Sequence, residues 1–166
     1  MEIYTIGYEG ASIDVWLKVL STRNITCLVD IRERPISRKK GFSKTKLMQS
    51  VEALGIKYIH IKELGSPSDI RTQLHKEGDY ITFFERYEQH LDHQIKAINE
   101  LSELAQEETI CLLCFEQNHA RCHRNSVAKR LKSLIPKEAK IINVDCSERV
   151  AREEHFDYGK NLPYAQ

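Results

Sequence analysis

The sequence predicts an α/β protein, with one domain built on a mostly parallel sheet of about five strands and helices on both faces. Short apolar runs alternate along the chain with segments in which apolar residues recur at helical spacing. The 166 residues supply one compact core and leave little room for a second, so we expect residues 1–166 to form a single domain. Strand–helix–strand connections form right-handed βαβ units, and these produce a parallel, Rossmann-like sheet in three layers.

Five short apolar segments are the expected strands. They are residues 3–6, 25–29, 57–61, 109–115 and 140–144. The run 109–115 is the most apolar in the chain, which is typical of a strand buried on both faces at the centre of a parallel sheet.

Four segments with helical spacing are the expected helices. They are residues 13–20, 44–54, 80–105 and 120–134. Ser12 and Ser43 precede the first two segments and are expected N-caps. The segment 80–105 predicts either two helices or one broken helix, and Pro136 ends the last segment.

Polar segments connect these elements. Residues 31–43 are polar and basic and contain Pro35 and Gly41, so they predict a loop. Residues 64–67 are turn-rich. The tail from Ser147 is polar, and we expect it to dock through its large side chains, which are Phe156, Tyr158, Leu162 and Tyr164.

The net charge of +1 conceals a segregated distribution of charged residues. Residues 23–46 carry eight Lys and Arg against two acidic residues, which is a net charge of +6. Residues 62–108 have a net charge of −6, and residues 121–140 have a net charge of +6. A charge block is most often a solvated helix face, whereas two basic blocks that meet in space would form an anion site.

Cysteine usage and hydropathy indicate a reduced, cytoplasmic protein. The five cysteines are odd in number and lie mostly among apolar residues, which does not favour a disulfide scaffold. No apolar run approaches the ~20 residues of a membrane helix, and the N-terminus lacks the pattern of a secretory signal. We expect no membrane partner and no cofactor, and the sequence leaves the oligomeric state open.

The expected strands end in polar residues, and in a parallel sheet ligands bind outside the carboxyl ends of the strands. Asp30 and Arg32 follow the second strand, and Arg38 lies in the loop beyond them. Arg124 lies in the first turn of the last helix, where free N–H groups also favour an anion. A guanidinium binds phosphate or carboxylate in a bidentate way, so these arginines indicate an anion site. The alternative is that Asp30 pairs with Arg32 or Arg124 and holds the loops in place.

Glu116 and His123 are the expected acid–base residues. Partial burial just past a strand would raise the pKa of Glu116, unless it pairs with an arginine. A histidine at a helix N-terminus tends to stay neutral, and His123 could exchange a proton or simply pack. Cys122 could be a nucleophile, because a helix N-terminus with arginines lowers the pKa of a thiol.

The remaining cysteine patterns are weaker. Cys111 and Cys114 have redox-motif spacing, but residues three apart on a strand point to opposite faces. Cys114 and Arg121 resemble the anion-binding loop of phosphatases and rhodaneses, although six residues separate them instead of five. Four residues have the composition of a metal site: Cys114, His119, Cys122 and His123. They lack the paired spacing typical of zinc sites, so we assign no metal ligand.

A set of short motifs, taken together, resembles the family called domain of unknown function 488. The motifs follow the family's order along nearly the whole chain: Ile6-Gly7-Tyr8-Glu9-Gly10, Leu28-Val29-Asp30-Ile31-Arg32, Pro35, Ser37-Arg38, Gly41-Phe42-Ser43, Leu64-Gly65, Leu112-Leu113-Cys114-Phe115-Glu116, Cys122-His123-Arg124 and Leu162-Pro163-Tyr164. Ser66 is a departure, since the family pattern often has a second glycine there.

The resemblance implies a fold and a site, but no established activity. It implies as functional residues Tyr8, Glu9, Asp30, Arg32, Pro35, Ser37, Arg38, Glu116, Cys122, His123 and Arg124. The expected substrate-binding or anion-binding residues are therefore Tyr8, Glu9, Arg32, Ser37, Arg38 and Arg124. The expected catalytic residues are Asp30, Glu116, Cys122 and His123.

Three functions compete. The leading hypothesis is an enzyme, a hydrolase or transferase, that acts on an anionic substrate such as a nucleotide or a nucleic-acid component. The second is a nucleic-acid-binding module in which the stretch 32–46, with Lys39 and Lys40, tracks a phosphate backbone and Phe42 is available for stacking. The third, least favoured, is a metal-dependent enzyme.

Overall fold

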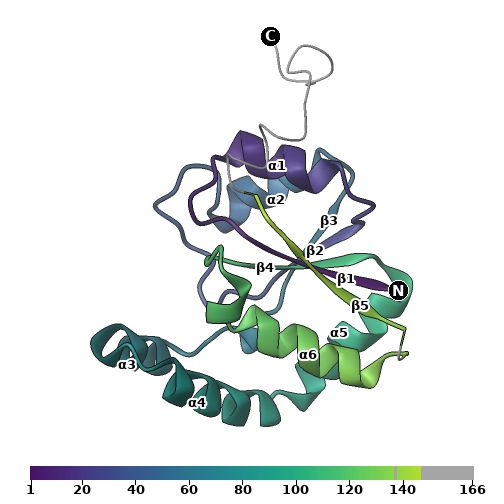
Figure 1. The fold of residues 1–166 in the computed structure, drawn as a ribbon. Helices are drawn as coiled ribbons and strands as arrows, with labels where there is room; N and C mark the ends of the chain where they lie inside the picture. The colour runs from purple at the N-terminus through teal and green to yellow at the C-terminus, as the bar shows by residue number, and fades with distance from the viewer. Residues whose placement is uncertain (137, 147–166) are drawn as a thin grey trace.

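The computed structural model describes residues 1–136 and 138–146, and in it five strands form one parallel sheet (Figure 1). The strands are β1 (Glu2–Gly7), β2 (Cys27–Asp30), β3 (Lys57–His60), β4 (Ile110–Cys114) and β5 (Lys140–Val144). Their order is β3-β2-β4-β1-β5, and every neighbouring pair is parallel. The five predicted strands are therefore confirmed, and β4 is central and buried along its length, as its apolar sequence predicts.

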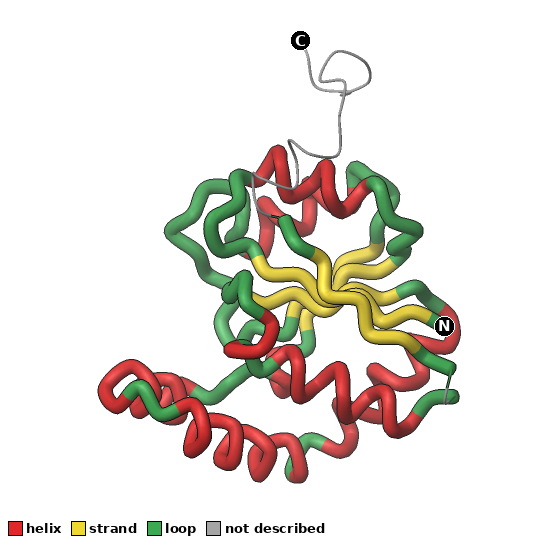
Figure 2. Tube along the Cα trace, viewed as in Figure 1, coloured by secondary structure: helices red, strands yellow, loops and turns green. Residues whose placement is uncertain are grey.

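Helices cover both faces of the sheet, which confirms the predicted α/β class (Figure 2). One face packs against α1 (Ile13–Ser21) and α2 (Lys44–Glu52), which bury Trp16 and Leu47. The other face packs against α5 (Ile95–Glu107) and α6 (Arg124–Leu134), with α4 (Tyr80–Asp92) beside them. The chain thus leaves β1 toward one face and leaves its neighbour β4 toward the other. In open parallel sheets, ligands bind beyond the carboxyl ends of strands that diverge in this way.

The helix α3 (Ser68–Glu77) is absent from the sequence-based prediction. It buries only Ile70, so it has no apolar stripe from which a helix could be recognised. It is held by polar contacts instead, because Arg86 of α4 bonds to Asp69 at 2.7 Å.

The structure decides two other predicted helical segments. The segment 80–105 forms two helices, α4 and α5, separated at residues 93–94, which confirms the first of the two predicted alternatives. The predicted helix 120–134 begins only at Arg124, after the short 3-10 helix η2 (His119–Arg121). Asn118 caps η2 by accepting a hydrogen bond from the backbone N–H of Ala120. Cys122 follows η2 with an extended backbone, at φ −128° and ψ 138°, and this separates the turn from α6.

The serine caps behave differently from each other. Ser12 Oγ accepts the backbone N–H of Val15 and caps α1, as predicted. Ser43 stands at the N-cap position of α2 without a side-chain cap bond. Its hydroxyl instead accepts the N–H of Ser37 at 3.2 Å and donates to the Ser37 carbonyl at 3.0 Å. These two bonds close the loop 31–43, which is irregular as predicted.

Within residues 1–136 and 138–146, no helix combines the length and apolarity required to cross a bilayer. The tail expected to dock through Phe156, Tyr158, Leu162 and Tyr164 lies outside the described residues.

Candidate functional site

The carboxyl ends of three strands meet at one edge of the sheet. Gly7 of β1 pairs with Cys114 of β4, and Asp30 of β2 pairs with Leu113 of β4. The segments that follow these strands are therefore neighbours. The sequence places its polar motifs on these segments.

Four reactive side chains converge beyond the end of β4, and we call them the Cys–Glu–His cluster: Cys114, Glu116, Cys122 and His123. One potential ligand atom from each lies within 4.8 Å of the others. The two cysteines and His123 are buried, and Glu116 is partly exposed. The structure thus brings together three of the four expected catalytic residues and adds Cys114.

A single carboxylate oxygen links the two thiols. Cys114 Sγ donates to Glu116 Oε2 at 3.0 Å, and Cys122 Sγ donates to the same oxygen at 3.1 Å. Cys114 Sγ is also 3.6 Å from Nδ1 of His123. Glu116 therefore connects the two thiols of the cluster. Its hydrogen-bond partners are thiols, and not the arginine with which we expected it to pair if it did not act as an acid or base.

His123 is held from two sides. Its Nε2 lies 3.2 Å from the carbonyl oxygen of Ile31, at the start of the loop after β2. The edge of its ring meets Tyr87 of α4 at 5.1 Å between centroids. With Nε2–H donated to the carbonyl, Nδ1 is the nitrogen left to face Cys114.

Two features hold the backbone between β4 and α6. Arg124, which is 1% exposed, donates to the carbonyls of Glu116 and Gln117 and to the hydroxyl of Thr5. Gly7 lies so close that a Cβ placed on it would be 1.9 Å from the Glu116 carbonyl oxygen. Arg124 therefore uses its donors on the protein itself, and glycine is required at position 7.

The pKa values in the cluster shift in the directions opposite to those expected from the sequence. Burial raises the pKa of Glu116, but His123 and the two thiols lower it by more. Burial lowers the pKa of His123, but Cys122 and Glu116 raise it by more. The pKa of His123 is therefore raised, whereas a histidine that stays neutral would need a lowered one. Burial raises the pKa of Cys122 well above its ordinary value and outweighs the neighbouring His123, so the expected lowering is also wrong.

Asp30 and Arg32 form a buried ion pair instead of joining the cluster. Arg32 donates Nε to Oδ1 of Asp30 at 2.8 Å and Nη2 to Oδ2 at 2.6 Å. Its remaining nitrogen, Nη1, donates to the Tyr8 hydroxyl and to the carbonyl of Phe42. Tyr58 also donates to Oδ2 of Asp30 at 2.6 Å. The pairing that the sequence left open as an alternative is the one that forms.

The residues implied by the family resemblance have varied surroundings. Tyr8 is buried and stacks on Phe42 at 4.3 Å between centroids. Glu9 accepts the backbone N–H of Gln117 at 3.0 Å, and Ser37 accepts that of Lys39 at 3.1 Å. Phe42 is 0% exposed, so the prediction that it stacks on a base at the surface is wrong.

Exposed basic residues remain on the loop 31–43. Within the part of the chain that the structure describes, the side chains of Arg34, Arg38 and Lys40 make no ion pair or hydrogen bond. Lys39 of the same loop donates to the carbonyl of Tyr8 at 3.2 Å. This loop therefore extends from the Ile31 carbonyl beside His123 to the end of β1.

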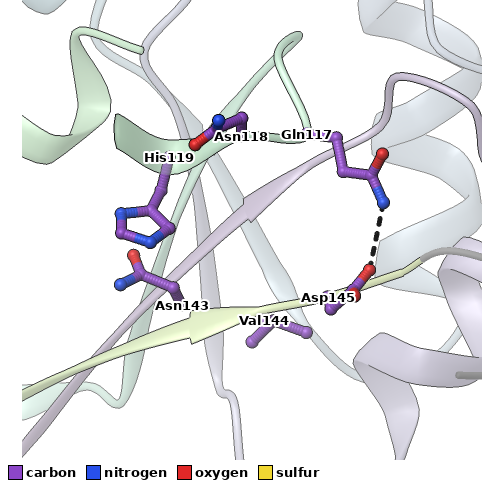
Figure 3. A pocket seen from close by; sticks show the side chains of 6 residues that line it. All are labelled: Gln117, Asn118, His119, Asn143, Val144 and Asp145. Atoms are coloured by element: carbon purple, nitrogen blue, oxygen red, sulfur yellow. Dashed lines mark hydrogen bonds between the residues drawn. The ribbon is translucent and has the colours of Figure 1, made fainter. Parts of the chain in front are cut away.

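Other sequence candidates lie apart from the cluster. His119 lines a separate cavity of about 270 Å³ with Gln117, Asn118, Asn143, Val144 and Asp145 (Figure 3). Its place in the metal-like set is taken by Glu116. Arg121 lies over the Tyr80 ring, 5.6 Å from the centroid, and does not complete an anion loop with Cys114. Cys111 packs in the core on the α1 side, opposite Cys114, as predicted.

Cys114 belongs to the Cys–Glu–His cluster but is absent from the catalytic residues expected from the sequence. It is the last residue of β4 and lies two residues before Glu116, with a bend at Phe115 between them. That spacing was the available signal. The contribution of Tyr87 from α4 had no comparable signal, because it depends on how α4 packs.

The fold and the site define a single-domain α/β protein with an all-parallel sheet and a buried thiol–carboxylate–imidazole cluster at its carboxyl edge. The chain belongs to the family described as "Domain of unknown function DUF488", which matches residues 12–131. The match starts after the Gly7–Gly10 motif and ends within α6, so it is shorter than the resemblance read from the motifs. No curated protein and no solved structure matches the chain.

Proposed function

We propose that this protein is an enzyme that acts on an anionic, phosphate-bearing substrate at the carboxyl edge of its sheet. The observation that carries the proposal is the convergence of the Cys–Glu–His cluster, whose four reactive side chains lie within 4.8 Å of one another. Clusters of titratable and nucleophilic groups at a strand edge are typical of active sites. Cytoplasmic location belongs to the same proposal, because two neighbouring thiols would be kept reduced there.

Glu116 is the proposed proton-transfer residue. It is the partly exposed member of the cluster, and its carboxylate already accepts two hydrogen bonds from thiols. In a hydrolysis or group transfer it would take the proton of the attacking hydroxyl, with His123 assisting. Asp30 has both oxygens engaged by Arg32, so we propose that it acts by positioning the loop instead of exchanging protons.

The anion would be bound by the loop 31–43. Arg32 and Arg124 donate to groups of the protein, which favours Arg34, Arg38 and Lys40 as the phosphate ligands. The loop touches the cluster through the contact between Ile31 and His123. We therefore propose that a phosphate bound by this loop reaches the reactive groups.

Ligand-induced thermal stabilisation tests this proposal, with inorganic phosphate, nucleoside monophosphates and nucleoside triphosphates as probes. We expect at least one probe to stabilise the wild type and to lose most of that effect in Arg38→Ala/Lys40→Ala. Lys96→Ala is the control, since Lys96 is 92% exposed on α5, where it pairs with Glu100 one turn along the same helix. Stabilisation by none of the probes, or an equal effect in the double variant, would contradict the proposal.

Turnover separates an enzyme from a binding module. Glu116→Gln should keep the thermal shift and lose release of phosphate or nucleoside from the probe that binds. If instead single-stranded RNA or DNA binds, with affinity that falls steeply with salt and no product forms, the protein is the nucleic-acid-binding module that the exposed lysines also allow.

A further inference from the structure

The Cys–Glu–His cluster has the composition of a transition-metal site. Two thiols and an imidazole are ligands for zinc and related ions, whereas Mg²⁺ and Ca²⁺ take oxygen ligands. The sequence lacks the paired spacing of a metal site, but the fold brings the ligands together. Cys114 is the last residue of β4, and Cys122 and His123 are the two residues between η2 and α6. Glu116 replaces His119 as the fourth member.

The ligand atoms of these side chains, which all lie within 4.8 Å of one another, are near the spacing of a tetrahedral site. With Zn–S bonds of ~2.3 Å and Zn–N or Zn–O bonds of ~2.0 Å, neighbouring ligand atoms lie ~3.3–3.8 Å apart. Cys114 Sγ lies 3.6 Å from His123 Nδ1. Each thiol sulfur lies 3.0–3.1 Å from Glu116 Oε2, so small side-chain movements would reach the required spacing.

The surroundings of His123 support the same assignment. A metal-binding histidine usually donates its second ring N–H to a carbonyl or carboxylate, which orients the ring. His123 Nε2 lies 3.2 Å from the carbonyl of Ile31, and Nδ1 faces Cys114. Arg124 and Gly7 hold the backbone around Glu116, so the ligand-bearing segment is fixed from both sides.

We propose that Cys114, Cys122 and His123 bind one divalent zinc-like ion through two thiolates and one imidazole nitrogen, with Glu116 as a displaceable fourth ligand. Binding breaks two S–H bonds and forms two metal–sulfur bonds, and His123 binds through its neutral imidazole. The two thiol protons, and any proton that His123 carries on the binding nitrogen, leave to solvent past Glu116, which accepts both thiol hydrogen bonds. The ion is not oxidised or reduced.

This inference deepens the proposed function and rests on it only in treating the cluster as the reactive centre. Catalytic zinc sites keep three protein ligands and an exchangeable fourth position. Glu116, as the partly exposed ligand, is the one that an anionic oxygen of a substrate would displace. The freed carboxylate would then remain beside the substrate to accept a proton.

The test uses the full chain, stripped with a chelator and kept reduced with a phosphine. We expect one Zn²⁺ per chain by elemental analysis and the absorption bands of tetrahedral thiolate coordination when Co²⁺ is added. We also expect release of about two protons per Zn²⁺ from the thiols, and of more where His123 is protonated. A wild-type protein that binds neither ion stoichiometrically, or that binds without proton release and thiolate bands, would overturn the inference.

Variants then identify the ligands. Cys114→Ser, Cys122→Ser and His123→Gln should each abolish stoichiometric binding, and Glu116→Gln should weaken it while the thiolate bands remain. Cys111→Ala is the matched control, because Cys111 is a buried thiol of the same strand on the opposite face. Equal loss in Cys111→Ala and Cys114→Ser would also overturn the inference.

The two proposals fail separately. Thermal stabilisation by phosphate compounds in the chelator-treated protein, without any metal binding, would refute the metal site and leave the anion-dependent enzyme standing. Stoichiometric metal binding without any response to anionic probes would support the metal site and refute the anionic substrate.

Discussion

Arg32 and Asp30 form a two-bond ion pair inside the protein, with side chains 6% and 0% exposed. The guanidinium also bonds to Tyr8 and to the carbonyl of Phe42, so one side chain joins the ends of β1 and β2 to the loop 31–43 that follows β2. The sequence suggests that Arg32 binds an anionic ligand. In the fold, the donors of its guanidinium are already bonded to groups of the protein itself.

Removal of this guanidinium should destabilise the protein strongly. Arg32→Met leaves the Asp30 carboxylate buried without its cation, and loss of one partner of a buried pair costs about 3–5 kcal/mol. Arg32→Lys should be only a partial substitute, because an ammonium cannot bridge both carboxylate oxygens. Urea denaturation provides the measurement.

Arg130→Met is the control for this prediction. Arg130 pairs with Glu88 and Asp92 near the surface, where such pairs contribute at most about 1 kcal/mol. A cost for Arg32→Met no larger than that for Arg130→Met would show that the buried pair does not hold the strand ends.

Gly7→Ala should distort the cluster. The new Cβ would lie 1.9 Å from the carbonyl oxygen of Glu116, so the backbone must move, at a cost of about 1–3 kcal/mol. We expect weaker Zn²⁺ and phosphate binding in addition to the lower unfolding free energy. Gly78→Ala strains the left-handed backbone at φ 68° with nothing near its Cβ, so it should lower stability alone.

Phe42→Ala should act on stability and not on a nucleic-acid surface. Phe42 is fully buried, stacks on Tyr8, and meets the edge of Trp16 at 5.6 Å. Loss of such a ring costs about 3–5 kcal/mol. Urea denaturation should therefore show a much larger loss than Phe115→Ala, since Phe115 is 44% exposed. A variant with wild-type stability and reduced RNA binding would contradict this prediction.

The cap of α4 predicts a pH dependence. Asp79 accepts hydrogen bonds from the Thr82 hydroxyl and from the N–H groups of Ile81 and Thr82, which lower its pKa below 3.8. Because the folded pKa lies below the unfolded one, the contribution to stability is present above about pH 3.8 and is lost as pH falls through the folded pKa. Carboxyl NMR titration should show this low midpoint.

Thr82→Val isolates the cause of that shift. It removes the hydroxyl donor and keeps the backbone donors, so the midpoint of Asp79 should rise toward 3.8 without reaching it. Lack of any change in the midpoint would mean that the hydroxyl bond does not act on the carboxylate.

Local pattern was sufficient to predict all five strands and their polar ends. A strand buried on both faces, such as β4, requires a continuous apolar run, and that requirement is visible in any window of the sequence. The helix α3 could not be predicted in this way, because it buries one residue and depends on contacts with α4 and with Glu33.

The sequence by itself determined that polar, basic and thiol groups stand at the carboxyl ends of the strands. Only the tertiary structure decided which of them meet. Arg32 pairs with Asp30, and Arg124 donates hydrogen bonds to backbone carbonyls. Glu116 instead lies together with Cys114, Cys122 and His123. The physical reason is that a buried polar group must find partners, and those partners come from distant segments, as Ile31 does for His123.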